Sequence, residues 1–315
     1  MGLHRHGLRV CATAITLLVA QAVLADELPP SQISTEVGFG YETQTSPLIR
    51  ISPQGELISI DGLQRLKATS LRVGVQGFAN WQLSGGWGLS LAGDMSQKRS
   101  PDNPDFNFGM VSVQPALHVA VGPGSVGWGL NWQHIDVAGA SFRDTGAVQM
   151  DWTQSGPDGS LWAMVVDVGS NRHFGELSDL DAHTASLVVQ RHLAKPGAGL
   201  ESADFAAYVS RERNDQGYGE LSYRSMMLTA SLQWQWRGVN WSAGTSLQKM
   251  QFDDTAMATD PLRVDRSVGV DLAAELDISP KHTLRVEYSR VRSVSTIAMY
   301  DNEYQQVAVK LNTAW

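Results

Sequence analysis

The residues with the clearest potential for catalysis stand close together in the middle of the chain. They are Asp181-Ala182-His183, Ser186 three positions later, and the preceding pair Arg172-His173. A carboxylate, an imidazole and a hydroxyl are the components of a nucleophilic or acid–base site, in which the imidazole activates the hydroxyl. A lipid-hydrolysing site of this kind requires the His and Ser side chains to meet on one surface.

The local pattern argues against such a meeting. Residues 182–194 are expected to form a strand, and successive side chains of a strand point to opposite faces. His183 and Ser186 are an odd number of positions apart, so they lie on different faces. Arg172-His173 falls in an expected loop, where a basic pair is usually solvated. We predict that the chain is not an enzyme, has no catalytic residues and needs no cofactor.

Metal binding has equally little support in the sequence. Asp102-Asn103-Pro104-Asp105 offers the oxygen ligands that calcium prefers, but it lacks the Gly-containing twelve-residue frame of a helix–loop–helix calcium site. The His, Asp and Glu residues do not show the spacing of a zinc site. We expect a solvent-exposed turn at 102–105 and no bound metal.

Other charged residues recur at alternate positions of the expected strands, always opposite in parity to the apolar residues. If the strands close into a barrel, these charges line its lumen. The set comprises Arg72, Asp94, His118, Asp151, Asp167, Asp271, Glu275, Arg285, Glu287 and Lys310. Acids outnumber bases in it, which favours a conduit with some preference for cations. For any single member, charge pairing that stabilises a wet interior is the simpler interpretation.

Alternation of apolar and polar residues predicts the strands that position these charges. The clearest runs are 108–121, 223–237 and 264–278. The fourteen expected strands are 33–41, 70–84, 87–97, 108–121, 125–138, 144–154, 160–170, 182–194, 203–213, 223–237, 240–252, 264–278, 282–295 and 304–315. The count has a margin of two, because Pro47–Ile60 could form a hairpin of its own around Pro53-Gln54-Gly55.

The connections between these strands alternate in length. Every second one is mostly short, as in Gly85-Gly86, Gly122-Pro123-Gly124 and Gly238-Val239. Those between them tend to be longer and more polar, as in 42–69, 171–181 and 253–263. Short periplasmic turns and longer outer loops are typical of single-chain outer-membrane barrels, and an even strand number leaves both termini in the periplasm.

The N-terminal segment predicts export. Residues 1–25 combine Arg5 and Arg9 with an apolar stretch and small residues before Asp26, which is the pattern of a secretory signal peptide. Its removal takes away Cys11 and leaves 22 basic against 32 acidic residues, a net charge near −10. Thiolate chemistry is therefore excluded from the mature chain, and a nucleic-acid partner is not expected. We assign 26–315 to a single barrel domain.

The tryptophans favour a membrane setting for this barrel. All ten share the apolar parity of their strands, and only Trp132 is deep within a strand. A ring of indoles at one height forms the aromatic girdle of a membrane interface. The nine expected girdle residues are Trp81, Trp87, Trp128, Trp152, Trp162, Trp234, Trp236, Trp241 and Trp315.

The last expected strand keeps the alternation of apolar and polar residues up to its final residue, a tryptophan. In 307–315, Val307, Val309, Leu311 and Trp315 share one face, which is expected to contact outer-membrane lipids. A terminal aromatic residue after alternating apolar positions resembles the signal that the barrel assembly machinery reads. Because no backbone edge can stay open in lipid, the last strand must pair with the first.

The closing segment also resembles a known family. Leu284–Arg290, Ser293, Tyr300-Asp301 and the terminal strand are similar to the final hairpin of the surface lipoprotein assembly modifier barrels, and Gly38–Glu42 is similar to their opening strand. The resemblance implies a 14-stranded outer-membrane barrel that exports surface lipoprotein. Family members carry a helical repeat domain before the barrel, whereas only Asp26–Gln32 precede the first expected strand here.

These observations lead to one expectation and several alternatives. We predict an all-β, fourteen-stranded transmembrane barrel of the bacterial outer membrane that acts as a conduit or translocation pore for an exported polypeptide. The alternatives are a general or solute-specific diffusion channel, a lipid-acting barrel enzyme, and a non-conducting adhesin or scaffold that uses 42–69.

Overall fold

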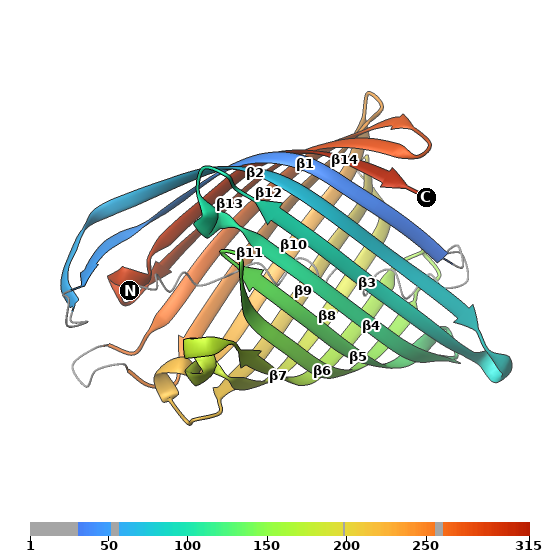
Figure 1. Cartoon of the computed structure of the whole chain (residues 1–315). Coiled ribbons are helices and arrows are strands. Elements are labelled where there is room, and N and C mark those ends of the chain that lie inside the picture. The colour runs from blue at the N-terminus through green and yellow to red at the C-terminus, as the bar shows by residue number, and fades with distance from the viewer. Residues whose placement is uncertain (1–30, 52–56, 198, 256–260) are drawn as a thin grey trace.

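The computed structural model describes residues 31–51, 57–197, 199–255 and 261–315 (Figure 1). The described chain consists of fourteen strands and five short 3-10 helices. The strands are β1 (Ser31–Ile51), β2 (Leu57–Gln82), β3 (Trp87–Arg99), β4 (Phe108–Val121), β5 (Gly124–Val137), β6 (Ala140–Ser155), β7 (Leu161–His173), β8 (Ala182–Gly197), β9 (Leu200–Asn214), β10 (Tyr223–Trp236), β11 (Val239–Phe252), β12 (Val264–Ser279), β13 (His282–Ser295) and β14 (Asn302–Ala314). The 3-10 helices are η1 (Ser84–Gly86), η2 (Pro104–Phe106), η3 (Gly175–Leu180), η4 (Gly219–Leu221) and η5 (Ala298–Tyr300).

The strands form one closed antiparallel barrel. Each strand pairs with its neighbours in sequence, and β1 pairs with β14 from Ser34↔Ala314 to Thr45↔Glu303. Figure 1 shows the steep tilt of the strands around the wall. Closure satisfies the backbone N–H and C=O groups of every strand, which is the condition for a β structure to sit in lipid. The predicted fold class, strand number and closing pair are confirmed.

The predicted long loop over 42–69 is wrong. β1 and β2 continue past the predicted ends and stay paired as far as Ile51↔Leu57, with register shifts near Pro47 and Arg50. Alternation of apolar and polar residues marks lipid contact, and it fades in this hairpin although its backbone pairing continues. The hairpin proposed around Pro53-Gln54-Gly55 has its tip outside the described residues, and its flanks belong to β1 and β2.

Two of the connections are two-residue turns with the same backbone geometry. The loop expected at 139–143 is a two-residue turn, in which Ala138 and Gly139 have φ of 53° and 81°. Arg237 and Gly238 repeat this geometry with φ of 53° and 76°. Positive φ at both central positions defines a type I′ turn, whose twist suits adjacent antiparallel strands.

The barrel has two unlike ends, which we name for their connections. The turn end carries the short connections 83–86, 122–123, 156–160, 237–238 and 280–281, together with Ser31 and Trp315. The loop end carries η2, η3, η4, η5 and the turn at 138–139. In outer-membrane barrels the short turns face the periplasm and the longer loops face outward. The predicted signal peptide, 1–25, lies outside the described residues.

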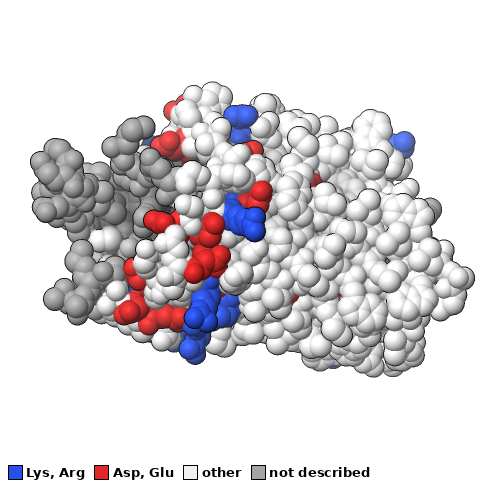
Figure 2. All heavy atoms as spheres, turned by 60° about the horizontal axis from the view of Figure 1, so that its bottom comes forward, with Lys and Arg blue, Asp and Glu red and all other residues white. Residues whose placement is uncertain are grey.

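The outer face is apolar through the middle of the barrel. Alternate positions expose large apolar side chains, among them Val73, Val148, Leu228, Val268 and Val309. Figure 2 shows this broad uncharged surface, with charged atoms gathered toward one end of the molecule. A soluble protein rarely exposes so large an apolar surface, whereas a barrel in lipid requires it. The architecture is therefore that of an outer-membrane barrel. Among the described residues, no helix is long and apolar enough to cross a membrane.

Candidate functional site

The inner wall of the barrel is the candidate site. On each strand, the charged residues predicted to line the lumen have the parity opposite to the exposed apolar residues. For example, Arg72 lies between the exposed Leu71 and Val73, and Asp167 lies between the exposed Val166 and Val168. Side chains of a closed barrel alternate between lipid and lumen. All ten predicted lumen residues therefore share the inner face.

Five inward charges form a continuous chain over four strands. Lys310 Nζ on β14 lies 3.2 Å from Glu36 Oε2 on β1 and 3.0 Å from Glu287 Oε2 on β13. Arg285 Nε lies 2.6 Å from Glu287 Oε1, and its guanidinium also contacts Glu275 on β12. We call these five residues the charge ladder. Its members are partly screened from water, so each charge needs its partner.

Two acidic groups beside the ladder, Asp94 and Asp271, form no ion pair with a Lys or Arg among the described residues. Asp271 lies midway along β12, points inward and is nonetheless exposed to solvent. Asp94 on β3 is half-buried, and its Oδ1 has no hydrogen-bond partner among the described residues. The Asp271 side chain is therefore accessible from the lumen at the middle of β12.

His118 stands at the centre of a second polar group. Its Nε2 lies 2.8 Å from Ser90 Oγ, and its Nδ1 lies 3.8 Å from Asp151 Oδ1. Gly127 separates His118 from Asp151 in the strand register, and a Cβ there would come within 2.3 Å of Asp151 Oδ2 and 2.5 Å of His118 Nδ1. A side chain at this position would therefore displace the imidazole or the carboxylate.

This group has the residue types of a nucleophilic triad without its geometry. The His118–Asp151 distance is too long for the hydrogen bond that orients the imidazole. Ser90 Oγ also lies 3.5 Å from the carbonyl oxygen of Ala116, an alternative acceptor for its proton. Ser90, His118 and Asp151 therefore form a polar patch on the lumen wall.

The residues first considered for catalysis are separated by the fold. His183 points outward, its side chain is 74% exposed, and its Nε2 lies 3.5 Å from Asp215 Oδ1. Ser186 points inward and donates a hydrogen bond of 3.0 Å to Asp167 Oδ2. The opposite parity expected from the sequence is the observed arrangement. His173 ends β7, where its backbone N–H donates to Asp181 Oδ1.

The structure adds a buried carboxylate that the sequence analysis missed. The Glu42 side chain is fully buried on the inner face, where Lys98 Nζ lies 2.8 Å and Tyr304 OH 2.7 Å from its Oε2. This contact joins β3, β1 and β14. The predicted end of the first strand at 41 excluded Glu42. The parity of Glu36, Gly38 and Gly40, extended by two positions, would have included it.

A second missed cluster lies on β7, β9 and β10. Glu212 Oε2 accepts hydrogen bonds from Asn171 Nδ2 at 3.0 Å and from Tyr223 OH at 3.1 Å. Beside it, Val165 and Val188 form a small buried apolar patch on the inner face. Asn171, Val165 and Val188 are buried, whereas the side chains of the charge ladder are 13–32% exposed.

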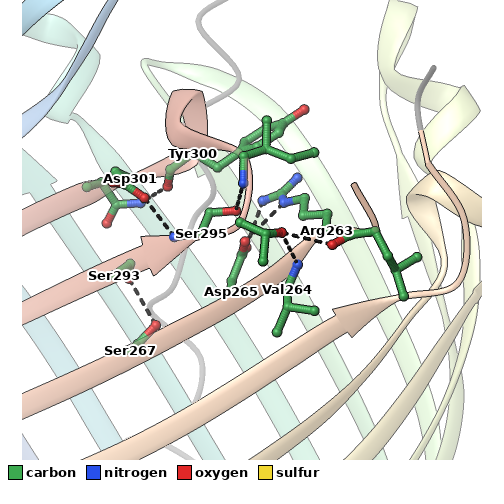
Figure 3. Close-up of polar contacts among 12 residues, drawn as sticks. Arg263, Val264, Asp265, Ser267, Ser293, Ser295, Tyr300 and Asp301 are labelled. Carbon is green, nitrogen blue, oxygen red and sulfur yellow. Dashed lines mark hydrogen bonds and ion pairs between the residues drawn. The ribbon is translucent and has the colours of Figure 1, made fainter. Parts of the chain in front are cut away.

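The loop-end rim over β12–β14 is tied together by Arg263 (Figure 3). The guanidinium forms two hydrogen bonds to the buried Asp265, at 3.2 and 2.8 Å, and lies 3.4 Å from the ring centre of Tyr300 in η5. Thr296 Oγ1 accepts a hydrogen bond from Val264 N and donates one to Leu262 O. These bonds hold the β11–β12 and β13–β14 connections against each other at the mouth.

The acidic stretch at 102–105 is an exposed turn, as expected. Asp102 accepts hydrogen bonds from Thr69 N at 2.9 and 3.1 Å and from Thr69 Oγ1 at 2.9 Å. These donors lower the pKa of the Asp102 carboxyl group. Over the described ranges, no group of three or more His, Cys, Asp and Glu residues could hold a metal ion.

The nine predicted girdle tryptophans lie toward the turn end. Trp234 and Trp241 are paired in the register and stack at 6.5 Å, and Trp87 and Trp128 lie 6.2 Å apart. Trp315 is 71% exposed; its backbone N–H donates to Ile33 O at 2.9 Å. The deeper Trp132 is also exposed on the outer face.

Comparisons with known proteins give matches among solved structures alone. No protein-family model matches it, and no curated protein matches it. Similar solved structures include Pseudomonas aeruginosa OpdK with vanillate, at 10% identity over 90% of this chain and 99% of that chain, with a TM-score of 0.46. OccK9 (OpdG) of the same organism has 10% identity over 90% and 98%, with a TM-score of 0.47.

A Vibrio cholerae protein is similar to the same degree. OmpT without its loop L8 has 8% identity over 91% of this chain and 100% of that chain, with a TM-score of 0.47. These scores and identities are low, and the closed barrel follows from the strand pairing of this chain. The resemblance to surface lipoprotein assembly modifiers stays a hypothesis.

Proposed function

We propose that this chain is an outer-membrane channel through which small polar solutes diffuse. The observation that carries the proposal is the wet and charged inner wall, in which Asp271 is exposed to solvent at the middle of an inward strand face. About eight strands close tightly enough for side chains to fill a barrel, and about sixteen leave an open aqueous channel. Fourteen strands leave room for a restricted path.

The arrangement of the described elements supports an open path. Every substantial contact between them joins strands that are neighbours around the wall, or joins a strand to a 3-10 helix beside it. Within the described ranges, no element makes such a contact across the lumen. A scaffold without a conduit would have no need for inward charges that water can reach.

The charge balance favours cations or solutes with both signs of charge. The ladder offers acids and bases in alternation, while Asp94, Asp167 and Asp271 add carboxylates with no ion pair to a Lys or Arg among the described residues. Excess negative charge in an aqueous passage with low-dielectric walls raises the local concentration of cations. The proposed solutes are therefore small cations and zwitterions.

Planar-bilayer recording tests this function. The purified protein should give stepwise currents, with a reversal potential in a KCl gradient displaced toward potassium. Asp271→Asn should reduce that displacement, whereas Asp105→Asn, in the exposed turn at the loop end, should leave it unchanged. Absence of steps from a barrel that is inserted and folded would overturn the channel proposal.

The remaining membrane assignments complete the proposal. The nine girdle tryptophans would hold the turn end at the periplasmic interface, because indole joins an apolar body to an N–H that prefers headgroups. The terminal strand would be the segment that the barrel assembly machinery recognises. Export of lipoprotein would need a client-binding part that the described barrel does not supply.

A further inference from the structure

Basic side chains gather on the outer face close to the loop end. They occur on β7 and on each of β9–β13, within five residues of the end of the strand. The set is Arg172, Arg211, Arg213, Arg224, Lys249, Arg266, Arg290 and Arg292. Figure 2 shows basic atoms in this end region, at the border of the uncharged surface. They lie on the lipid-facing parity and are separate from the lumen.

Two pairs of these bases face each other directly. Arg211 is opposite Arg224 between β9 and β10, and Lys249 is opposite Arg266 between β11 and β12. Like charges at directly opposed positions repel each other and destabilise a sheet. Arg211 contacts Asp253, but Arg224, Lys249 and Arg266 form no ion pair with any residue that the structure describes.

Arg224, Lys249 and Arg266 form one contiguous group, the basic cluster. Arg224 is opposite Gln251, so it lies diagonally across from Lys249, within reach of long side chains. All three are exposed. An anion bound between these three side chains would reduce the repulsion among their positive charges.

The residues next to the basic cluster indicate which kind of anion it would bind. Two residues toward the barrel middle on the same face, Met226, Leu247 and Val268 are 60%, 52% and 51% exposed. Each base of the cluster therefore stands next to an apolar side chain that faces lipid. A ligand that satisfies both has an acidic headgroup at the level of the bases and acyl chains below it.

We propose that the basic cluster binds the phosphate groups of a phosphorylated lipid in the outer leaflet of the membrane. A phosphate monoester carries up to two charges and three acceptor oxygens, which matches several convergent bases better than a single phosphodiester does. Bisphosphorylated lipid A is the probe with this chemistry. The site does not depend on conduction, so a closed barrel would bind the lipid equally well.

The experiment compares two triple variants that lose the same charge. Arg224→Gln, Lys249→Gln and Arg266→Gln remove the cluster. Arg191→Gln, Arg237→Gln and Lys281→Gln remove three exposed bases at the turn end and serve as the matched control. Each protein is titrated in nanodiscs of phosphatidylcholine with lipid A, and bound lipid A is counted by native mass spectrometry.

The cluster variant should bind lipid A at least about tenfold more weakly than wild type, since each base near an anionic surface contributes to binding. The control variant should bind as wild type does, and dephosphorylated lipid A should not distinguish the three proteins. Equal losses in both variants, or no loss in the cluster variant, would overturn the proposal. Lys249→Gln alone provides the same comparison with a smaller change if the triple variant does not assemble. Planar-bilayer currents of the cluster variant should stay normal.

Discussion

Glu36 and Lys310 meet across the seam that closes the barrel. Their side chains, from the first and last strands, approach to 3.2 Å, although the two residues stand near opposite ends of the described chain. Lys310 also lies 3.0 Å from Glu287, so a single ammonium group links β1, β13 and β14. Lys310 thus contributes both to the contacts across the closing seam and to the charge of the lumen.

Replacing Lys310 with Met should lower the stability of the closed barrel. The variant leaves Glu36 and Glu287 close together without their shared cation, and Lys310 is 13% exposed. For this partly screened site we expect a loss of about 2 kcal/mol. The measurement is the temperature at which the folded band converts on semi-native electrophoresis. Lys281→Met in an exposed turn is the control; an equal shift in both would contradict a seam-specific role.

Gly127→Ala should separate His118 from Asp151. The new methyl group would stand within 2.5 Å of both side chains, so the strands or the two groups must shift, at a cost of about 1–3 kcal/mol. Thermal unfolding in detergent measures the cost. Gly146→Ala on the adjacent strand meets no atom within 4 Å and should change stability little. If the two variants unfold at the same temperature, the close approach at Gly127 does not contribute to stability.

Arg285→Gln should make the channel more selective for cations. The substitution removes the base between Glu275 and Glu287 and leaves two carboxylates facing the lumen. The reversal potential in a KCl gradient should move further toward potassium, opposite to the effect of Asp271→Asn. Arg237→Gln, outside the lumen at the turn end, is the control. A reversal potential that moves toward chloride would contradict the proposal that the lumen wall carries excess negative charge.

Deleting Trp315 should impair membrane assembly. The terminal residue contributes an exposed indole and the last backbone hydrogen bond to β1, from Trp315 N to Ile33 O. The fraction of heat-modifiable protein in the membrane measures assembly. Trp236→Ala removes an exposed tryptophan from the same girdle without touching the terminus, and it should assemble more completely. Normal insertion of the truncated chain would contradict the role of the terminus.

The attachment of Asp102 to Thr69 should weaken in acid. Hydrogen bonds from Thr69 lower the pKa of Asp102 in the folded protein, so the contribution of this contact is present above the pKa of the unfolded chain, near 3.9. It is lost as the pH falls through the lower, folded pKa. Amide exchange at Thr69 between pH 2 and pH 6 should report this loss. Asp102→Asn should remove the pH dependence, and Asp105→Asn should not.

The sequence alone determined the barrel. Lipid on one side and water on the other impose alternation on every spanning strand, so 108–121 and 282–295 are predicted to the residue. The same parity determined that Arg72, Asp271 and Lys310 face inward and that His183 and Ser186 cannot meet. The predicted strand ended at Tyr41 because the alternation fades where β1 and β2 extend beyond lipid.

Only the tertiary structure decided which charges meet. Glu42 finds Lys98 and Tyr304, and Glu36 finds Lys310, because strand register and closure bring residues distant in sequence to one level of the wall. Periodicity specifies the face of a side chain but not its height relative to other strands. Lys249 and Arg266 illustrate this limit on the outer face. The alternation in the sequence predicts that each side chain points outward, but only the strand register shows that the two are opposite each other.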